Sequence, residues 1–410
     1  MEPMTVRSPE KQAELPALKR PATAGAVLIA VMFCLACVAL PLADNPTVAR
    51  IFTALAAVFC FVLTRQLRGV LYYAVPALAI YMLSEYIPFF KDPFTCVAAF
   101  LAILVGGGCG SLLLTHYHDL KRGLPLLVLP VAAYGISAFV TGDPLRGLLV
   151  LIPTAVAIVA AVCLLRNMER GIATVLITAT VAVSLVIAGV ATLGAMNVLN
   201  ANPLDFLAEE MRLGIFAQLV ENRQLELEIL QNYQQQFPSL SQTISQMAIS
   251  NDTELQNTAI TVVNVSPGVF LALCATAGFF IWHMLLQQLT AFGCTERLPI
   301  HLIGFNVSRI GAVIFLLGGA VALFSGDVSI FSTICLNLAI VLSPGLALIG
   351  YSSLFTGQRS CLSILLAFGL LALTFFNPLG GLAAAALLGA VQTLFTRFFH
   401  SHHNNEKGEQ

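Results

Sequence analysis

This sequence has very few charged residues. Asp, Glu, Lys and Arg make up 10% of the 410 residues, whereas a soluble domain carries about a quarter. Hydrophobic residues make up 58%. Because so little charge cannot cover a water-exposed surface, an ordinary soluble protein is excluded. The net charge of −1 and the lack of a basic stripe also exclude nucleic acid as a partner.

The sequence also lacks the motifs of common enzymes. It has no H-E-x-x-H, G-x-S-x-G or nucleotide-binding pattern, and no Lys-Ser or Lys-Thr follows the glycine run Gly106–Gly110. No Asp, Glu or Lys stands at mid-depth in an apolar run, which disfavours a carboxylate ion relay and an intramembrane aspartyl protease. We therefore expect no catalytic residues and no cofactor, and any ATP-driven energy must come from other chains.

Disulfide and metal patterns are lacking as well. The ten cysteines lie in or beside apolar runs, and Cys34-x-x-Cys37 sits inside one without polar neighbours. We interpret this pair as small packing residues rather than a redox or metal site. We interpret the histidines at His116 and in the tail from His400 as solvent-exposed residues beside apolar runs, so no metal site is expected.

What the sequence does have is a series of long apolar runs. Most of these runs are long enough to cross a hydrocarbon core of roughly 30 Å as a helix. The third is short and little more than Asn377 separates the last two, so we expect 11 or 12 transmembrane helices in an all-α polytopic integral membrane protein. The runs are 22–42, 48–64, 69–83, 94–115, 124–140, 145–165, 171–196, 267–289, 306–324, 328–355, 360–376 and 378–399.

Basic residues gather in alternate loops. With the N-terminus in the cytoplasm, most of the 20 Lys and Arg residues fall on the cytoplasmic side, including Arg65, Arg68, Lys121 and Arg122. Basic loops favour that side of a membrane. We therefore expect a multi-pass protein of the cell inner (plasma) membrane, with both termini in the cytoplasm.

A polar segment at 197–266 separates the seventh run from the eighth. It carries eight Asp and Glu residues against two Arg, which suits the extracytoplasmic side. The expected domains are a cytoplasmic tail (1–21), a seven-helix N-terminal membrane bundle (22–196), an extracytoplasmic amphipathic helical insert (197–266), a five-helix C-terminal membrane bundle (267–399) and a second cytoplasmic tail (400–410).

The insert has helical patterns of its own. Asn202-Pro203 predicts a helix start, and the apolar residues from Leu204 to Leu219 recur on one stripe. Pro238 interrupts a second such pattern, so two or three helices are expected rather than one rod. Asn251-Asp-Thr-Glu predicts a last short helix. The insert either covers the outer mouth of the bundle, forms a dimer interface, or simply connects the two bundles.

Two sets of residues are candidates for function. His283 and Gln287 lie one helical turn apart on the same face, where they can contact a solute or a neighbouring helix. The candidate polar residues, which line a cavity or bond between helices, are Asn197, His283, Gln287, Asn337 and Gln392. The candidate helix-docking residues, which recur at i, i+4 and i+8 on small-residue faces, are Ala22, Ala26 and Ala30, and Gly381, Ala385 and Gly389.

A series of motifs runs through the C-terminal half, namely a proline-led run at Pro267, then CTERLP, ICLNLAIVLSPGLALIGY and LLGAVQTLFTRFF. The order of these motifs resembles the YybS-like family of uncharacterised predicted membrane proteins, with Asn337, Gly345 and Gly389 as the matching positions. Where that family commonly has an acidic residue beside an arginine, this chain has Gln392 and Arg397.

The N-terminal half is similar in style to the substrate-binding S components of energy-coupling-factor transporters. That resemblance implies that the face of Ala22, Ala26 and Ala30 docks a partner subunit. Two functions stay open. One is binding or passage of a small uncharged or amphipathic solute, with energy from other chains. The other is a non-transport scaffold or assembly factor for envelope machinery, with membrane proteins or a second copy of this chain as partners beside the lipid bilayer.

Overall fold

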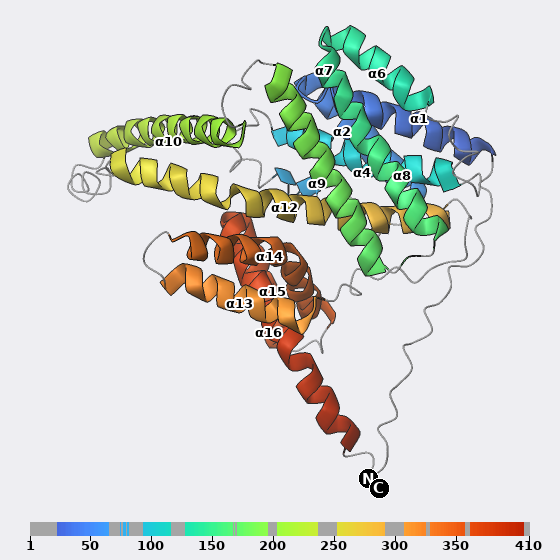
Figure 1. Cartoon of the computed structure of the whole chain (residues 1–410). Coiled ribbons are helices and arrows are strands. Elements are labelled where there is room, and N and C mark those ends of the chain that lie inside the picture. Colours follow the sequence, from blue (N-terminus) through green and yellow to red (C-terminus); the bar gives the residue numbers. More distant parts are fainter. Residues whose placement is uncertain are drawn as a thin grey trace. The chain divides into compact units, whose positions relative to one another are not determined.

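The computed structural model describes the following parts of the chain. The described residues are 23–64, 74, 77–78, 80–81, 93–115, 128–166, 168, 170–195, 203–236, 252–291, 307–324, 329–356 and 361–405. The third expected run, 69–83, falls largely outside them. Within these ranges every regular element is helical (Figure 1), which confirms the all-α class.

Fourteen helical elements are described. They are α1 (Thr23–Ala39), α2 (Pro46–Thr64), α4 (Pro93–Thr115), α6 (Val128–Thr141), α7 (Pro144–Gly147), the 3-10 helix η2 (Leu148–Val150), α8 (Leu151–Leu165), α9 (Arg170–Ala195), α10 (Pro203–Gln236), α12 (Asp252–Ala291), α13 (Arg309–Phe324), α14 (Ile330–Thr356), α15 (Cys361–Phe376) and α16 (Pro378–Asn405). Apart from 69–83, each expected apolar run corresponds to one of these helices or to a continuous series of them.

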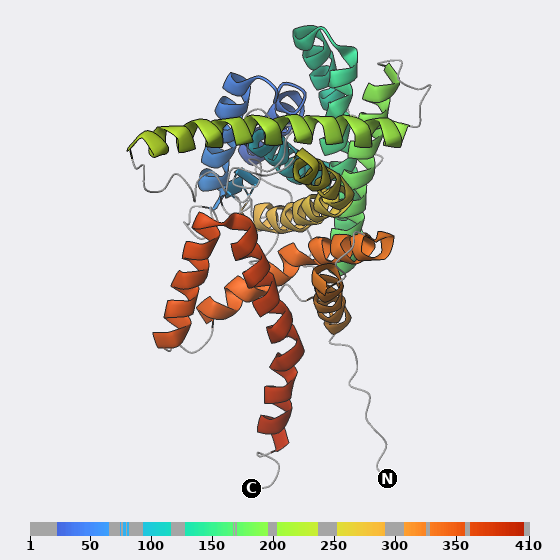
Figure 2. The same ribbon diagram turned by 90° about the vertical axis from the view of Figure 1, so that its left-hand side faces the viewer.

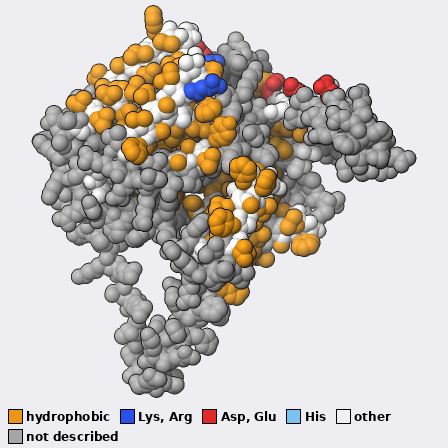
Figure 3. Space-filling view, turned by 180° about the vertical axis from the view of Figure 1, so that it is seen from behind, with side chains coloured by type: hydrophobic (Ala, Val, Ile, Leu, Met, Phe, Trp, Pro, Cys, Tyr) orange, Lys and Arg blue, Asp and Glu red, His pale blue; other side chains and the backbone are white. Residues whose placement is uncertain are grey.

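Six described segments are long and apolar enough to cross a membrane, namely Phe94–Thr115, Pro144–Leu165, Gly171–Ala191, Leu255–Ala291, Ile330–Leu354 and Pro378–Phe395. Five shorter apolar helices accompany them. Large hydrophobic side chains also lie open on the surface, including Phe139 at 89% and Phe324 at 87% exposure. Figure 3 shows hydrophobic side chains spread across the described surface on the face it draws. A water-soluble protein rarely exposes so much apolar area, so this surface contacts the lipid bilayer.

Several helices begin where an amide or carboxylate residue precedes a proline. Asn45 Oδ1 accepts the Thr47 N–H at 3.0 Å ahead of α2, and Asp143 Oδ1 accepts the Leu145 N–H at 2.9 Å ahead of α7. Asn377 caps α16 in the same way, through a 2.9 Å bond from the Gly380 N–H. Since a proline at the first helical position lacks only an N–H that would have no partner there, these starts are well defined. Asn377 thus separates α15 from α16, which diverge from this turn in Figure 2.

The insert follows its predicted pattern at two helix starts and departs from it at one point. α10 begins at Pro203 and its last described residue is Gln236, two residues before Pro238. A helix also begins at Asp252, as the capping pattern predicts. The expectation of a last short helix is wrong, because α12 continues through Pro267 to Ala291 as one 40-residue helix. Part of the second apolar pattern, 237–251, lies outside the described residues.

The chain divides into two compact units by contact. Unit 1 comprises residues 1–77, 97–184 and 277–300, and unit 2 comprises residues 78–96, 185–276 and 301–410. The end of α12 groups with the N-terminal helices of unit 1. Residues 252–276 of α12 belong to unit 2 and residues 277–291 to unit 1.

In unit 1, α4 and the end of α12 are the enclosed helices. Of the most apolar stretch of α4, 94% is buried, whereas only 17% of the most apolar stretch of α9 is buried. Ala277 through Leu285 on α12 are all buried. A helix that is buried on every side forms the centre of a bundle, so α4 and this part of α12 make up the core of unit 1.

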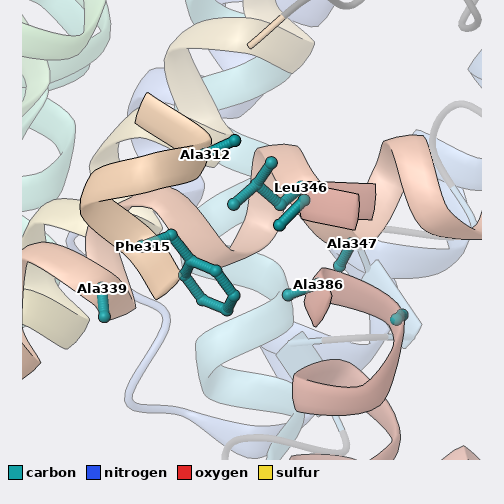
Figure 4. Close-up of a cluster of buried hydrophobic side chains, with 8 residues drawn as sticks. Ala312, Phe315, Ala339, Leu346, Ala347 and Ala386 are labelled. Atoms are coloured by element: carbon teal, nitrogen blue, oxygen red, sulfur yellow. The ribbon is translucent and has the colours of Figure 1, made fainter. Parts of the chain in front are cut away.

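In unit 2, the core is built from small side chains of α13, α14 and α16. Its buried members are Ala312, Phe315, Ala339, Leu346, Ala347, Ala385, Ala386 and Ala390 (Figure 4). Because alanine adds little bulk, such a core lets helix backbones approach closely, as small residues do between membrane helices.

Candidate functional site

The enclosed end of α12 carries several polar side chains. Trp282 is 2% exposed, and His283 and Gln288 are fully buried. Polar groups in such a place are costly unless they form hydrogen bonds. We refer to Trp282, His283, Gln287 and Gln288 as the polar cluster of unit 1.

Glycines of α4 bring neighbouring helices close to this cluster. A Cβ added at Gly107 would lie 2.6 Å from Val156 Cγ1 of α8 and 3.5 Å from Ile281 Cγ2 of α12. A Cβ at Gly110 would lie 2.6 Å from Ala157 Cβ. Real Cβ atoms do not approach so closely, so α8 can pack on α4 only because these positions are glycine. The glycine run therefore serves close contact between helices.

Gly108 faces the polar cluster itself. A Cβ at this position would lie 3.3 Å from Gln288 Oε1 and 3.4 Å from Met284 Sδ. Gln288 also donates from Nε2 to Cys109 Sγ at 3.7 Å. The side of α12 that carries Met284 and Gln288 therefore lies directly against the glycine run of α4.

His283 is held by its own helix. Its Nδ1 lies 3.0 Å from the carbonyl oxygen of Phe279, and its ring centroid lies 4.1 Å from that of Phe279. Since a carbonyl oxygen can only accept, Nδ1 carries the proton in this contact. This geometry describes a packed, hydrogen-bonded histidine.

Three buried polar atoms of the cluster have no hydrogen-bond partner among the described residues. They are Trp282 Nε1, Gln287 Oε1 and Gln288 Oε1. Leaving a buried donor or acceptor unsatisfied costs about 1–3 kcal/mol. Gln287 and Gln288 point about 100° apart around the helix, so the unpaired oxygens lie on adjoining faces of α12. The cluster thus has hydrogen-bonding capacity that its described neighbours do not use.

The remaining polar candidates lie elsewhere. Asn197 is outside the described residues. Asn337 belongs to α14 in unit 2, where its side chain contacts α12 at Asn264 and Gly268. Gln392 is partly buried on α16, also in unit 2. Of the four described polar candidates, His283 and Gln287 lie together on α12 in unit 1, and Asn337 and Gln392 lie in unit 2.

The C-terminal helix-docking candidates contact other helices of this same chain. A Cβ added at Gly389 would overlap the carbonyl oxygen of Leu346, and one added at Gly350 would overlap that of Ala385. A Cβ added at Gly381 would likewise overlap the hydroxyl oxygen of Thr374 in α15. These residues form the crossing of α14 with α16 and the turn after α15. Ala26 and Ala30 are partly buried on α1, and Ala22 lies outside the described residues.

Spacing within the sequence pointed to Gln287 and missed Gln288. Gln287 shares a face with His283, but Gln288 is the residue that meets α4. The dipeptide Gln287-Gln288 and the run Gly106–Gly110 were both visible signals, and only the packing of α4 on α12 joins them. Within the described residues, no group of three or more His, Cys, Asp or Glu side chains is placed to hold a metal ion.

Comparison with protein-family models, with curated proteins and with solved structures finds no match to this chain.

Proposed function

We propose that this membrane protein binds a small uncharged solute at the polar cluster of unit 1. The observation that carries the proposal is the buried Oε1 of Gln288 beside Gly108, which has no hydrogen-bond partner among the described residues. A ligand with an N–H or O–H group would supply the missing donor and recover the roughly 1–3 kcal/mol that an unsatisfied acceptor costs.

The composition around the cluster supports an uncharged ligand. Neither α4 nor residues 277–291 of α12 contain Asp, Glu, Lys or Arg. Burying an ion without a countercharge is strongly unfavourable. A neutral molecule with hydrogen-bonding groups and an apolar remainder fits these surroundings best.

Native mass spectrometry of the purified full-length protein tests the proposal. We expect the wild type and Gln218→Leu to retain the same small molecule, and Gln288→Leu to retain at least tenfold less. Gln218 is exposed on α10 and so provides the same chemical change away from the cluster. Gln288→Leu also removes the Gln288 Nε2–Cys109 Sγ contact, so circular dichroism checks that both variants keep the helical fold. Equal retention by both variants would contradict the assignment of the site.

The same preparation separates binding from a scaffold role. Co-purification of an ATPase and coupling subunits would support transport driven by other chains. Envelope-assembly proteins without any bound small molecule would instead support the scaffold function. We propose a non-enzymatic role in either case, because the sequence carries none of the catalytic motifs considered above.

We further propose an inner-membrane location with both termini in the cytoplasm and the insert, including α10, outside. The distribution of Lys and Arg between alternate loops supports this orientation, and reporter fusions at residues 1, 240 and 410 test it. The order of motifs from Pro267 to Gly389 supports membership in the YybS-like family. Detection of the same motif order in relatives with an intact insert would test that membership.

A further inference from the structure

Pro267 interrupts the hydrogen-bond ladder of α12. Proline has no N–H, so the carbonyl of Val263 lacks the backbone donor that a regular helix would give it. The hydroxyl of Ser266 donates to this carbonyl instead, at 2.8 Å. The helix continues on both sides of the break, and the next donor and acceptor along it are the Gly268 N–H and the Asn264 carbonyl.

A side chain from α14 forms hydrogen bonds with both of these backbone groups. Asn337 Oδ1 accepts the Gly268 N–H at 2.5 Å, and Asn337 Nδ2 donates to the Asn264 carbonyl at 2.8 Å. In a regular helix the Gly268 N–H would donate to that same Asn264 carbonyl. One carboxamide from α14 therefore joins both members of a backbone pair in α12. We call this arrangement the Asn337 bridge.

Gly268 is needed for the bridge. A Cβ at this position would lie 2.5 Å from Asn337 Oδ1, 2.9 Å from Asn337 Cα and 3.0 Å from the Asn337 carbonyl oxygen. Two of these three atoms belong to the backbone of α14 and cannot rotate away. Any larger residue would therefore push the two helices apart.

The partner helix contains the same interruption. Ser343-Pro344-Gly345 repeats the tripeptide Ser266-Pro267-Gly268, and Ser343 Oγ donates to the Ile340 carbonyl at 2.8 Å. Ile340 stands four residues before Pro344, as Val263 does before Pro267. Both helices joined by the bridge thus have a proline break that a serine hydroxyl caps.

We propose that the Asn337 bridge is one state of a two-state hinge in unit 2. In the bridged state Asn337 holds Gly268 and Asn264, and α14 lies against α12. In the released state the Gly268 N–H donates directly to the Asn264 carbonyl, Asn337 keeps its 2.9 Å bond to the Thr333 carbonyl of its own helix, and α14 moves away. Nearly the same donors and acceptors form hydrogen bonds in the two states, as a bistable element requires. A side chain inserted into a helix ladder is also a known cause of helix bending.

Distance measurements between spin labels test the hinge in the full-length protein in lipid nanodiscs. The labels are attached to azidophenylalanine at Gln256 and Ile330, two exposed positions in unit 2, so that native cysteines stay unmodified. We expect the wild type to show two distances. Asn337→Leu removes the bridge and Pro267→Ala completes the α12 ladder, so each should shift the ratio of the two populations toward the longer distance by at least tenfold.

Asn257→Leu is the matched control, because it makes the same change at an exposed position on α12. It should leave the wild-type ratio unchanged. A single distance in the wild type would overturn the hinge, whatever the variants show, because the bridge would then be a fixed contact. Two distances with a ratio that Asn337→Leu and Pro267→Ala leave unchanged would also overturn it. The wild-type measurement keeps the test decisive if either variant fails to fold.

Discussion

Replacement of Gly389 by alanine should destabilise unit 2 severely for so small a change. The added Cβ would overlap the Leu346 carbonyl oxygen and would lie 2.8 Å from the Leu346 carbonyl carbon and 2.9 Å from the Gly350 nitrogen. All three atoms belong to the backbone of α14, so no rotamer change relieves the contact. Inserting a methyl group into a packed core typically costs about 1–3 kcal/mol. We expect the upper end, about 3 kcal/mol, because α14 and α16 must separate.

The matched control is Gly369→Ala on α15. A Cβ at Gly369 meets nothing within 4 Å, and alanine in a helix interior is favoured over glycine by roughly 0.5–1 kcal/mol. The two variants therefore make the same chemical change with opposite expected signs. Reversible denaturation in mixed micelles, followed by circular dichroism, measures both free energies of unfolding. Equal stability of the two variants would refute the reasoning, since it would mean that the α14–α16 crossing does not depend on backbone contact at Gly389.

Three further substitutions test other contacts. Gly278→Ala should destabilise unit 1 by about 1–3 kcal/mol, because the new Cβ would overlap the Thr178 hydroxyl and lie 2.9 Å from the Thr178 nitrogen; thermal unfolding measures this. Arg212→Ala should raise the pKa of Glu209 toward its ordinary value of 4.5, because hydrogen bonds from Arg212 lower that pKa. Carbon-13 NMR titration measures this change. Any stabilisation by the pair is present above pH 4.5 and is lost as the pH falls through the lowered pKa. Asn377→Ala should cost about 1 kcal/mol through loss of the α16 cap, which denaturation in mixed micelles detects.

The sequence predicted the fold class and many helix boundaries because these depend on local chemistry. Apolar runs predict helices that cross a bilayer, and the proline after Asn202 predicts the start of α10 wherever the rest of the chain lies. The same reasoning failed at Pro267. There α12 continues as one helix, and Asn337 of α14, 69 residues away in the sequence, accepts the Gly268 N–H beside the proline.

In the candidate site, too, local sequence patterns do not predict which residue contacts another helix. Helical spacing pairs His283 with Gln287, and that relation needs no knowledge of neighbours. Whether Gln287 or Gln288 meets another helix depends on the rotation of α12 against α4, and the position of Gly108 determines which amide fits there. No pattern within α12 contains that information.

The crossing of α14 and α16 also bears on how relatives of this protein can be recognised. At Gly350 and Gly389 the side chain is excluded by backbone atoms of the opposite helix, whereas lipid-facing positions such as Leu387 and Val391 can exchange with any residue of similar hydrophobicity. Substitution should therefore accumulate rapidly on the outer surface and slowly at the crossing. Distant relatives will share the spacing Gly350, Ala385 and Gly389 after their apolar residues have diverged beyond recognition.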